Sequence, residues 1–557
     1  VTFPAEEIRG GHMLSGLGVP DMRGGIGTPT LYTTDPARDP ADNEFAVRVV
    51  LLEDDGGPSR AGDRAGLSYV SDVVGPDNLP FHDYAIEMAG EGIESRDLKR
   101  QAERHMEDRL KARGVPKVLK LPLNIQVDRE RKTVTVSASG QEWTLRPGQW
   151  SGWTTFTFPV NWLVNRLNPV EGAARFYLLS VEPELNLYLA PLNFHPDFHP
   201  VPFSYPAGWA SKLARRFGLF KTLGWAIDTW TMSAGLAGEK FTLSDLHATE
   251  EKYGQMMEHL LAESDDDLYV QIFTGPDRAG HMLWRLMDPG HPLYDSEVAD
   301  RWGGALKEVY MQMDRIVGRA MNLLPEGSTL IVCSDHGFSS YRRGINYNTW
   351  LARKGFMTLA SRDGGYGETK TLEDLFHGGT FFENVDWSRT KAYAMGLGEI
   401  YINLEGREPQ GVVRPGDEYE QVRDAIVRGL ESFVDPATGQ HPVHRVYRRE
   451  EIYSRFNAAI VPDLRASNNL GYRVEWQTAL GGFTPEIVSD NLKLWSGDHC
   501  SLDPQFVKGI LFINRPLQLR DPGIVDLAPT MLDILGVPPP SGLDGVSLLS
   551  HSRVARR

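Results

Sequence analysis

The sequence predicts an α/β fold in which a mostly parallel sheet lies between helices and a β-rich domain is inserted. The stretch "DLYVQIF" (267–273), an amphipathic segment (297–324) and the apolar stretch "TLIVC" (329–333) follow one another. This strand–helix–strand order is typical of parallel strands joined by a helical crossover. Residues 36–205 differ, because segments such as "KTVTVSAS" alternate apolar and polar residues as half-buried strands do.

Length, composition and charge narrow the class of protein. The 557 residues predict two or three domains, since one hydrophobic core rarely serves so long a chain. The net charge of −16 and the lack of a Lys/Arg-rich run argue against binding to duplex nucleic acid. No apolar run approaches the ~20 residues of a transmembrane helix, and the first residues do not resemble a signal peptide. Two cysteines, Cys333 and Cys500, predict no disulfide framework, so the compartment stays open.

The elements, taken in order, predict five regions. A Gly-rich, loop-like segment comes first and the β-rich insertion second. The strand–helix–strand unit lies in the third region, and short strands ("EIYINL") alternate with helices ("EYEQVRDAIVRGLESFV") in the fourth. A strand ("KGILFINRPL") and a helix ("GIVDLAPTMLDILGV") form the last. We therefore predict part of the α/β core at 1–35, an inserted β-rich domain at 36–205, α/β core with metal ligands at 206–340, a core extension or cap subdomain at 341–490, and the C-terminal part of the core at 491–557.

Carboxylates and imidazoles stand beside apolar strands in three separated places. Asp277 and His281 lie four residues apart, Asp335 and His336 are adjacent in "SDHG", and His499 follows in "SGDHC". Open α/β sheets build their sites beyond the carboxyl ends of strands. Asp and His without clustered thiolates suit Zn²⁺ or a similar divalent ion. Each place alone is more typical of a helix cap and a surface imidazole than of a ligand pair, whereas three together favour a metal site.

The order Asp-x-x-x-His, Ser-Asp-His-Gly, Gly-x-His resembles the alkaline phosphatase superfamily. The similarity is greatest to its type I phosphodiesterase/nucleotide pyrophosphatase branch and to related predicted phosphohydrolases and phosphomutases. Stretches such as "GEIYINLEGREPQG" and "SGDHCSLDPQFVKGILFINRP" carry the resemblance over most of residues 206–557. It implies an alkaline-phosphatase-like core and a metal-dependent phosphoric ester hydrolase, above all a phosphodiesterase acting on a small phosphodiester or nucleotide-like substrate.

The resemblance also implies two divalent metal ions. By this resemblance Asp277, His281 and His499 hold one ion, while Asp335 and His336 supply half the ligands of a second. Zn²⁺ is the preferred ion, and Mn²⁺ or another divalent ion is the alternative. Two such ions would stabilise the attacking and leaving oxygens of an in-line phosphoryl displacement.

The resemblance further implies an Asp at the end of a first strand and a Thr or Ser nucleophile at the next helix start. Asp21 and Asp35 do not follow apolar strands in the sequence, and no Thr or Ser near them begins a helix, so the catalytic nucleophile stays unknown. Because the chain begins at Val1 in what reads as mid-domain, we expect this part to be a separate N-terminal polypeptide, truncated or absent. The chain alone is then catalytically incomplete. Two alternatives stay open: a phosphomonoesterase or phosphomutase on the same core, and a non-catalytic fragment that binds phosphorylated ligands.

Overall fold

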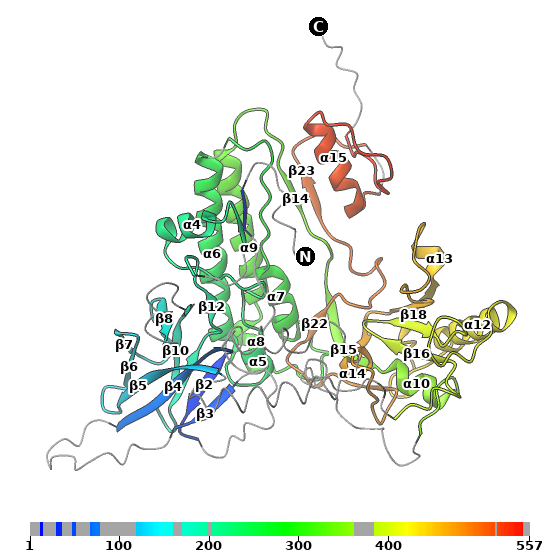
Figure 1. The fold of residues 1–557 in the computed structure, drawn as a ribbon, viewed down its shortest axis with the longest axis horizontal. Coiled ribbons are helices and arrows are strands. Elements are labelled where there is room, and N and C mark those ends of the chain that lie inside the picture. The colour runs from blue at the N-terminus through cyan, green and yellow to red at the C-terminus, as the bar shows by residue number, and fades with distance from the viewer. Residues whose placement is uncertain are drawn as a thin grey trace, which may run out of the picture. The chain divides into compact units, whose positions relative to one another are not determined.

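The computed structural model describes residues 12–14, 29–35, 47–51, 67–77, 118–159, 170–198, 203–263, 265–360, 382, 384–518 and 521–549. The chain forms two compact units, Val1–Met256 and Met257–Arg557, both drawn in Figure 1. Within the described ranges no helix combines the length and the hydrophobicity needed to cross a bilayer. The five regions predicted from the sequence are a finer division than these two units, and their boundaries stay predictions.

In the described part of the first unit, strands come before helices. The strands are β1 (Met13–Leu14), β2 (Thr30–Thr33), β3 (Val47–Val50), β4 (Leu67–Asp77), β5 (Val118–Asp128), β6 (Thr133–Ala138), β7 (Gln141–Leu145), β8 (Thr154–Phe158), β9 (Val170–Ala174), β10 (Phe176–Ser180), β11 (Asn186–Leu189), β12 (Asn193–Phe194) and β13 (Ser204–Tyr205). The helices are α4 (Trp209–Phe217), α5 (Trp230–Ser233) and α6 (Glu239–Glu263), the last of which continues into the second unit.

The core of the first unit is built from alternating strand side chains. Strands β4-β5-β6-β7 form an antiparallel sheet, and every second residue of β5 is buried. Successive strand side chains point to opposite faces, so one face of β5 meets the core. Leu123 and Ile125 pack there with Val134, Val136 and Phe156. The further sheets β10-β11-β2-β3, β12-β9-β8 and β1-β13 complete the described strands of this unit.

In the second unit, helices and short strands alternate. They are α7 (Gly275–Leu283), η3 (Trp284–Leu286), α8 (Ser296–Trp302), α9 (Ala305–Leu323), β14 (Ile331–Cys333), β15 (Ser339–Ile345), α10 (Tyr347–Arg353), β16 (Ala392–Met395), β17 (Glu399–Ile402), α12 (Asp417–Glu431), β18 (Val443–Arg448), α13 (Arg449–Ile452), β19 (Leu464–Asn468), β20 (Gly471–Val474), α14 (Trp476–Ala479), β21 (Val488–Asp490), β22 (Gly497–Asp498), β23 (Leu511–Ile513), η4 (Ile524–Asp526) and α15 (Leu527–Ile534).

An antiparallel sheet and two helices form the main core of this unit. Strands β16-β17-β19-β18 pair in that order, and α10 and α12 lie against them (Figure 1). Trp350 of α10 and Ile426 of α12 are buried together with Ile400 and Ile402 of β17. Beside this core, β15 pairs in parallel with β20 and antiparallel with β21 and β22, whereas β14 pairs antiparallel with β23. The strands β14 and β22 lead to the candidate site.

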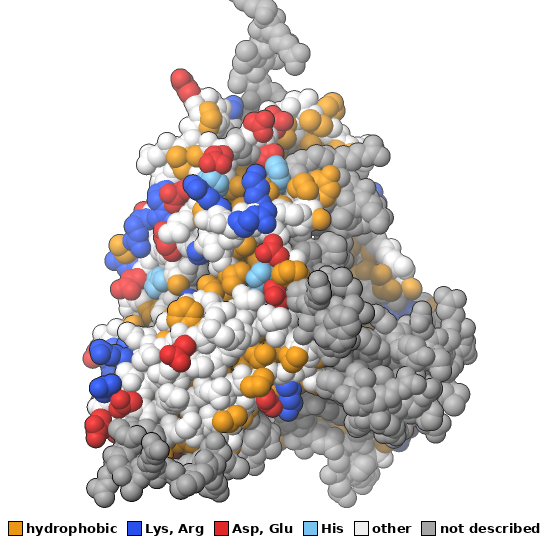
Figure 2. Space-filling model, turned by 60° about the vertical axis from the view of Figure 1, so that its left-hand side comes forward, with side chains coloured by type: hydrophobic (Ala, Val, Ile, Leu, Met, Phe, Trp, Pro, Cys, Tyr) orange, Lys and Arg blue, Asp and Glu red, His pale blue; other side chains and the backbone are white. Residues whose placement is uncertain are grey.

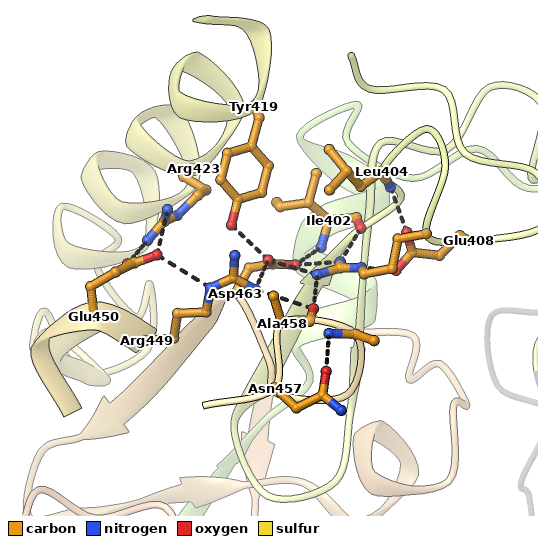
Figure 3. A network of polar contacts seen from close by, with 12 residues as sticks. Ile402, Leu404, Glu408, Tyr419, Arg423, Arg449, Glu450, Asn457, Ala458 and Asp463 are labelled. Carbon is orange, nitrogen blue, oxygen red and sulfur yellow. Dashed lines mark hydrogen bonds and ion pairs between the residues drawn. The ribbon is translucent and has the colours of Figure 1, made fainter. Parts of the chain in front are cut away.

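A buried carboxylate ties this sheet to its surroundings. Asp463 precedes β19 and is fully buried. Figure 3 shows the polar contacts around its carboxylate. Its carboxylate accepts hydrogen bonds from the Ile402 amide at 2.7 Å and the Tyr419 hydroxyl at 2.7 Å. Arg407 binds both of its oxygens, at 2.9 and 2.6 Å, and Arg449 lies 3.1 Å away. A buried charge is tolerated only when it is paired and hydrogen-bonded in this way.

The α/β class is confirmed, but the described strands do not form a mostly parallel sheet. Helices and strands are mixed as predicted, yet parallel pairing among the described ladders occurs only between β2 and β3 and between β15 and β20. The stretch 267–273, which was expected to be a core strand, has no strand partner in the described part of the chain. Without a neighbour on that edge, the predicted parallel pair with β14 does not form.

Some apolar side chains of the second unit are not covered. On the face drawn in Figure 2, orange apolar patches lie between charged side chains. The exposed apolar residues of this unit include Leu268, Val270, Ile272 and Phe512. Scattered apolar residues are ordinary on a surface, but three of these four stand at alternate positions of one segment.

Candidate metal centre

Helix α7 brings the first two predicted ligands together. Asp277 and His281 are four residues apart on it, and residues at that spacing lie on the same helix face. Pro276 lies in the first turn, where its missing amide hydrogen leaves no hydrogen bond unmade. Asp277 also lies in the first turn, where the helix dipole favours a negative charge. The local sequence therefore sets both the helix start and the direction of the pair.

A glycine ends the turn that delivers the second pair. Asp335 and His336 follow the end of β14 and precede Gly337. A Cβ atom at Gly337 would lie 2.5 Å from the Lys508 carbonyl oxygen, and its amide donates to the Val507 carbonyl at 2.7 Å. Only glycine fits so close to another backbone without a shift. This contact holds the end of the "SDHG" turn in place.

The last candidate ligand leaves the short strand β22. Gly497 and Asp498 form β22, which pairs with Ser340 and Ser339 of β15, and His499 comes next. Gly497 packs against the Gly280 carbonyl of α7 so closely that a side chain would clash with it. The close packing of β22 on α7 therefore explains how His499 reaches Asp277 across 222 sequence positions.

Three imidazoles surround one carboxylate oxygen. The Asp277 Oδ1 atom lies 3.4 Å from His281 Nε2, 3.6 Å from His499 Nε2 and 3.8 Å from His336 Nε2. The ligand atoms of Asp277, His281 and His499 all lie within 4.8 Å of one another. Ligands about 2.0 Å from a tetrahedral ion are about 3.3 Å apart. The first two distances therefore fit a carboxylate and two imidazoles on one small divalent ion.

Backbone carbonyls orient two of the imidazoles. His281 donates from Nδ1 to the Gly497 carbonyl at 2.8 Å, and His336 donates from Nδ1 to the Gly337 carbonyl at 3.0 Å. Because a carbonyl can only accept, these bonds place the proton on Nδ1 and leave the Nε2 lone pair towards Asp277. The ring of Trp495 stacks on His281 with centroids 3.8 Å apart, and the rings of His336 and His499 stack at 3.4 Å.

A buried ion pair supports the turn that carries His499. Asp498 and Arg473 are almost completely buried, and Arg473 Nε lies 2.6 Å from Asp498 Oδ2. Asp498 also accepts hydrogen bonds from Trp495 Nε1 at 2.7 Å and from the amides of His499 at 2.8 Å and Cys500 at 2.7 Å. The same carboxylate thus fixes the backbone of His499 and the indole that stacks on His281.

The charges favour a deprotonated ligand set. Burial lowers the pKa of His499 to about 4, and its neighbouring imidazoles add to this effect against the pull of Asp498. Burial alone would raise the pKa of Asp277, but the favourable interaction with His281 in its cationic form, with Arg278 nearby, holds it below its usual value. Burial would also raise the pKa of Asp498, yet Arg473 and the donors around it hold that pKa at about 2. Neutral imidazole and ionised carboxylate are the forms that bind metal.

The second predicted pair is arranged differently from the first. Asp335 is exposed, with 74% of its side chain accessible, and its Oδ2 lies 3.5 Å from His336 Nε2. His336 instead faces Asp277 together with the first set. Cys500, which the sequence analysis did not choose as a ligand, joins Asp498 and His499 in a second group of closely spaced donor atoms. Burial raises the pKa of the Cys500 thiol to about 12, which opposes its use as a thiolate.

Asp35, which follows no apolar stretch in the sequence, lies shortly after a buried strand in the structure. Asp35 comes two residues after β2 (Thr30–Thr33), and all four residues of that strand are buried. The stretch "TLYT" has threonines at both ends, so its burial was not visible from apolar residues alone. The other carboxylate considered, Asp21, lies outside the described residues.

Comparisons with known proteins agree with the resemblance seen in the sequence. The family model described as type I phosphodiesterase/nucleotide pyrophosphatase matches residues 194–481, a little over half of the chain. That range includes Asp277, His281, Asp335 and His336 but ends before His499. GPI ethanolamine phosphate transferase 3 of Schizosaccharomyces pombe (strain 972 / ATCC 24843) is 29% identical over 100 residues, which are 18% of this chain and 9% of that protein. No solved structure matches.

The family match is long enough to assign the chain. It covers the helix and the strand end that carry four of the five predicted ligands, in the predicted order. The relative from Schizosaccharomyces pombe belongs to the same superfamily. The chain therefore belongs to the type I phosphodiesterase/nucleotide pyrophosphatase family of the alkaline phosphatase superfamily.

Proposed function

We propose that this chain carries the metal centre of a phosphoric ester hydrolase of the phosphodiesterase type. Its substrate is a small phosphodiester or nucleotide-like molecule. The family match supports phosphoric ester chemistry in general. The observation that carries the proposal is the convergence of Asp277, His281 and His499, whose donor atoms lie within 4.8 Å of one another.

Each residue has a defined part in this proposal. Asp277, His281 and His499 hold one divalent ion, with Zn²⁺ preferred for two imidazoles and a carboxylate and Mn²⁺ as the alternative. When bound, such an ion supplies Lewis-acid stabilisation of the phosphoryl oxygens. Asp335 and His336 provide part of a second ion site. Since Asp335 is exposed and contacts His336 alone among these groups, this second site needs further ligands.

The nucleophile in this proposal is a Thr or Ser outside the described residues. A separate polypeptide that carries it, together with a strand-end Asp, would complete both the second metal site and the catalytic group. Denaturing intact-mass spectrometry of the native protein tests this directly. A second chain with an Asp and a Thr or Ser in strand-to-helix context supports a composite site, and a single species weighs against it.

The proposed activity is tested with two synthetic esters. The native protein, loaded with Zn²⁺ or Mn²⁺, is given bis-p-nitrophenyl phosphate and p-nitrophenyl phosphate in parallel. We expect faster release of nitrophenol from the diester, and loss of that release after chelation or in the His281→Ala variant. His441→Ala, a substitution of an exposed histidine elsewhere in the unit, is the matched control. Faster hydrolysis of the monoester would instead support a phosphomonoesterase or phosphomutase.

Two further functions are separated by the same assay. Phosphoryl transfer to an alcohol is supported by the similarity to a phosphate transferase, although that similarity covers 100 residues. Added alcohol would then replace water as the acceptor. The product from the diester would be a new phosphodiester of that alcohol instead of p-nitrophenyl phosphate. A protein that binds the metal and a phosphorylated ligand but releases no nitrophenol would be the non-catalytic binder.

A further inference from the structure

The three imidazoles of the metal centre come from separate segments and share an aromatic neighbour. His281 lies on α7, His336 follows β14 and His499 follows β22. The neighbour is Phe338, whose ring centroid lies 4.8, 5.5 and 5.3 Å from theirs, in that order. A side chain that touches segments so far apart in the sequence can fix their imidazoles relative to one another.

The contacts of Phe338 are close to the edge-to-face geometry that aromatic rings prefer. The plane of the phenyl ring is inclined at 74° to His281, 66° to His499 and 60° to His336. Such pairs are favourable because the positive edge of one ring meets the negative face of the other. The rings of His336 and His499 are in turn nearly parallel, at 7°. The phenyl ring therefore restrains the tilt of all three imidazoles.

The surrounding backbone holds Phe338 itself in place. It follows Gly337, whose amide donates to the Val507 carbonyl at 2.7 Å, and it directly precedes β15. On α7, Gly280 is so close that a Cβ atom there would lie 2.9 Å from the phenyl ring. The ring of Trp284 also stacks on it, with centroids 6.1 Å apart. A ring packed this closely has little freedom to turn, so it can hold its neighbours in place.

His499 depends on these ring contacts more than the other two imidazoles do. His281 and His336 each donate from Nδ1 to a backbone carbonyl. His499 makes no such bond to the described residues, and the thiol sulfur of Cys500 lies 3.7 Å from its Nδ1. Packing against His336 and Phe338 therefore contributes most to its orientation. A phenyl ring offers no donor or acceptor to an ion, a proton or a phosphate, so orientation is what Phe338 can supply.

We propose that Phe338 is a positioning residue of the metal centre. Its ring holds His499 beside His336 and sets the tilt of His281 before an ion binds. This role rests on the proposed function, because a positioning residue matters here only if these imidazoles bind an ion. Groups that orient metal ligands without touching the ion commonly change metal affinity by about 10- to 100-fold.

Two substitutions test the proposal in the full 557-residue chain. Phe338→Leu removes the ring but keeps an apolar side chain. Gly280→Ala keeps the ring but displaces it, because the added Cβ would lie 2.9 Å from it. Each metal-free protein is titrated with Zn²⁺ in competition with a chromophoric chelator, and its melting temperature is recorded. We expect at least about ten-fold weaker Zn²⁺ binding in both variants.

The visible absorption of bound Co²⁺ separates positioning from stability. Co²⁺ takes the same ligands as Zn²⁺, and its absorption bands depend on the geometry of those ligands. We expect Phe338→Leu to change these bands. Phe356→Leu is the matched control, because Phe356 is also half-buried and its ring stacks on Trp350 at 5.9 Å in the core of the same unit. It should lower the melting temperature without changing Zn²⁺ affinity or the Co²⁺ bands.

The remaining outcomes would overturn the proposal. Unchanged Zn²⁺ affinity and unchanged Co²⁺ bands in Phe338→Leu would show that the ring only fills space. Equal losses in Phe338→Leu and Phe356→Leu would show an effect of stability alone. Failure of the unsubstituted chain to bind Zn²⁺ would overturn the proposed function as well, so the two kinds of failure are distinguished.

Discussion

At the scale of single residues, the centre depends on side chains that do not touch the ion site. Asp498 binds Arg473, the Trp495 indole and the amides of His499 and Cys500. It therefore positions His499 directly and His281 through the stacked indole. Such outer groups orient the ligands of metal sites and raise their affinity.

Asp498→Asn tests this positioning. We expect Zn²⁺ affinity to fall about 10- to 100-fold, as is usual when an outer-shell carboxylate is lost. The affinity is measured by competition with a chromophoric chelator, and the melting temperature is recorded alongside. Asp300→Asn, at an exposed position of α8, is the control. Unchanged affinity for Zn²⁺ would show that Asp498 has only a structural role.

Asp288 should make the stability of the second unit dependent on pH. Burial would raise the pKa of its carboxyl, but hydrogen bonds from Arg342 and Ser340 hold that pKa below the usual value. A group with a lowered folded pKa stabilises above its unfolded pKa, about 3.9, and loses that contribution as pH falls through the folded pKa. Asp288→Asn should thus cost on the order of 1 kcal/mol at neutral pH, because solvent screens the partly exposed Arg342.

The cost should shrink as the pH falls below 4. Urea unfolding of both proteins at several pH values measures the difference in the free energy of unfolding. A difference that stays constant from neutral to acid pH would contradict the proposed ion pair.

At the scale of elements, the turn after β14 is a sensitive point. A Cβ at Gly337 would stand 2.5 Å from the Lys508 carbonyl oxygen. We expect Gly337→Ala to cost about 1–3 kcal/mol, as overpacking usually does, and to disturb the partial second ion site because His336 moves. Gly318→Ala is the matched control, since its Cβ would meet nothing within 4 Å inside helix α9. That change should stabilise by about 0.5–1 kcal/mol, and thermal unfolding compares the two variants.

The sheet β16-β17-β19-β18 should depend on Asp463. Asp463→Asn removes the fully buried carboxylate that binds Arg407 and Arg449. Glu408 stays 2.8 Å from Arg407, so we expect a loss of about 3 kcal/mol, at the lower end for a broken buried pair. Glu418→Gln, which removes an ion pair with Arg414 at the surface, should leave the free energy of unfolding nearly unchanged. Equal effects of the two substitutions in chemical denaturation would show that the buried network adds nothing.

Local sequence patterns predicted individual elements better than their pairing. The amphipathic segment 297–324 largely forms helices α8 and α9, and the strand before Asp335 is present, because each depends on short-range patterns of apolar residues. The partner of a strand is not encoded in its own residues, so the antiparallel pairing of β14 with β23 was not predicted. Likewise, Arg473 and Trp495 meet Asp498 only through folding, and no spacing in the sequence singled them out.

At the scale of the whole molecule, the family match and the ligand set overlap but do not coincide. The family match ends at residue 481, whereas His499 lies beyond it and still joins Asp277 and His281. The order of the motifs predicted which residues meet. It did not predict that His336 would face the same carboxylate as the other two imidazoles, because that depends on the direction of a turn.

The central claim is that Asp277, His281 and His499 hold a divalent ion. Native mass spectrometry of the metal-free chain, titrated with Zn²⁺, tests it most directly. We predict one tightly bound ion, with affinity at least about 100-fold lower in His281→Ala, since losing a ligand should cost at least as much as losing an outer-shell group, and unchanged in His441→Ala. Absence of a tightly bound ion, or equal binding by the His281→Ala variant, would contradict the account.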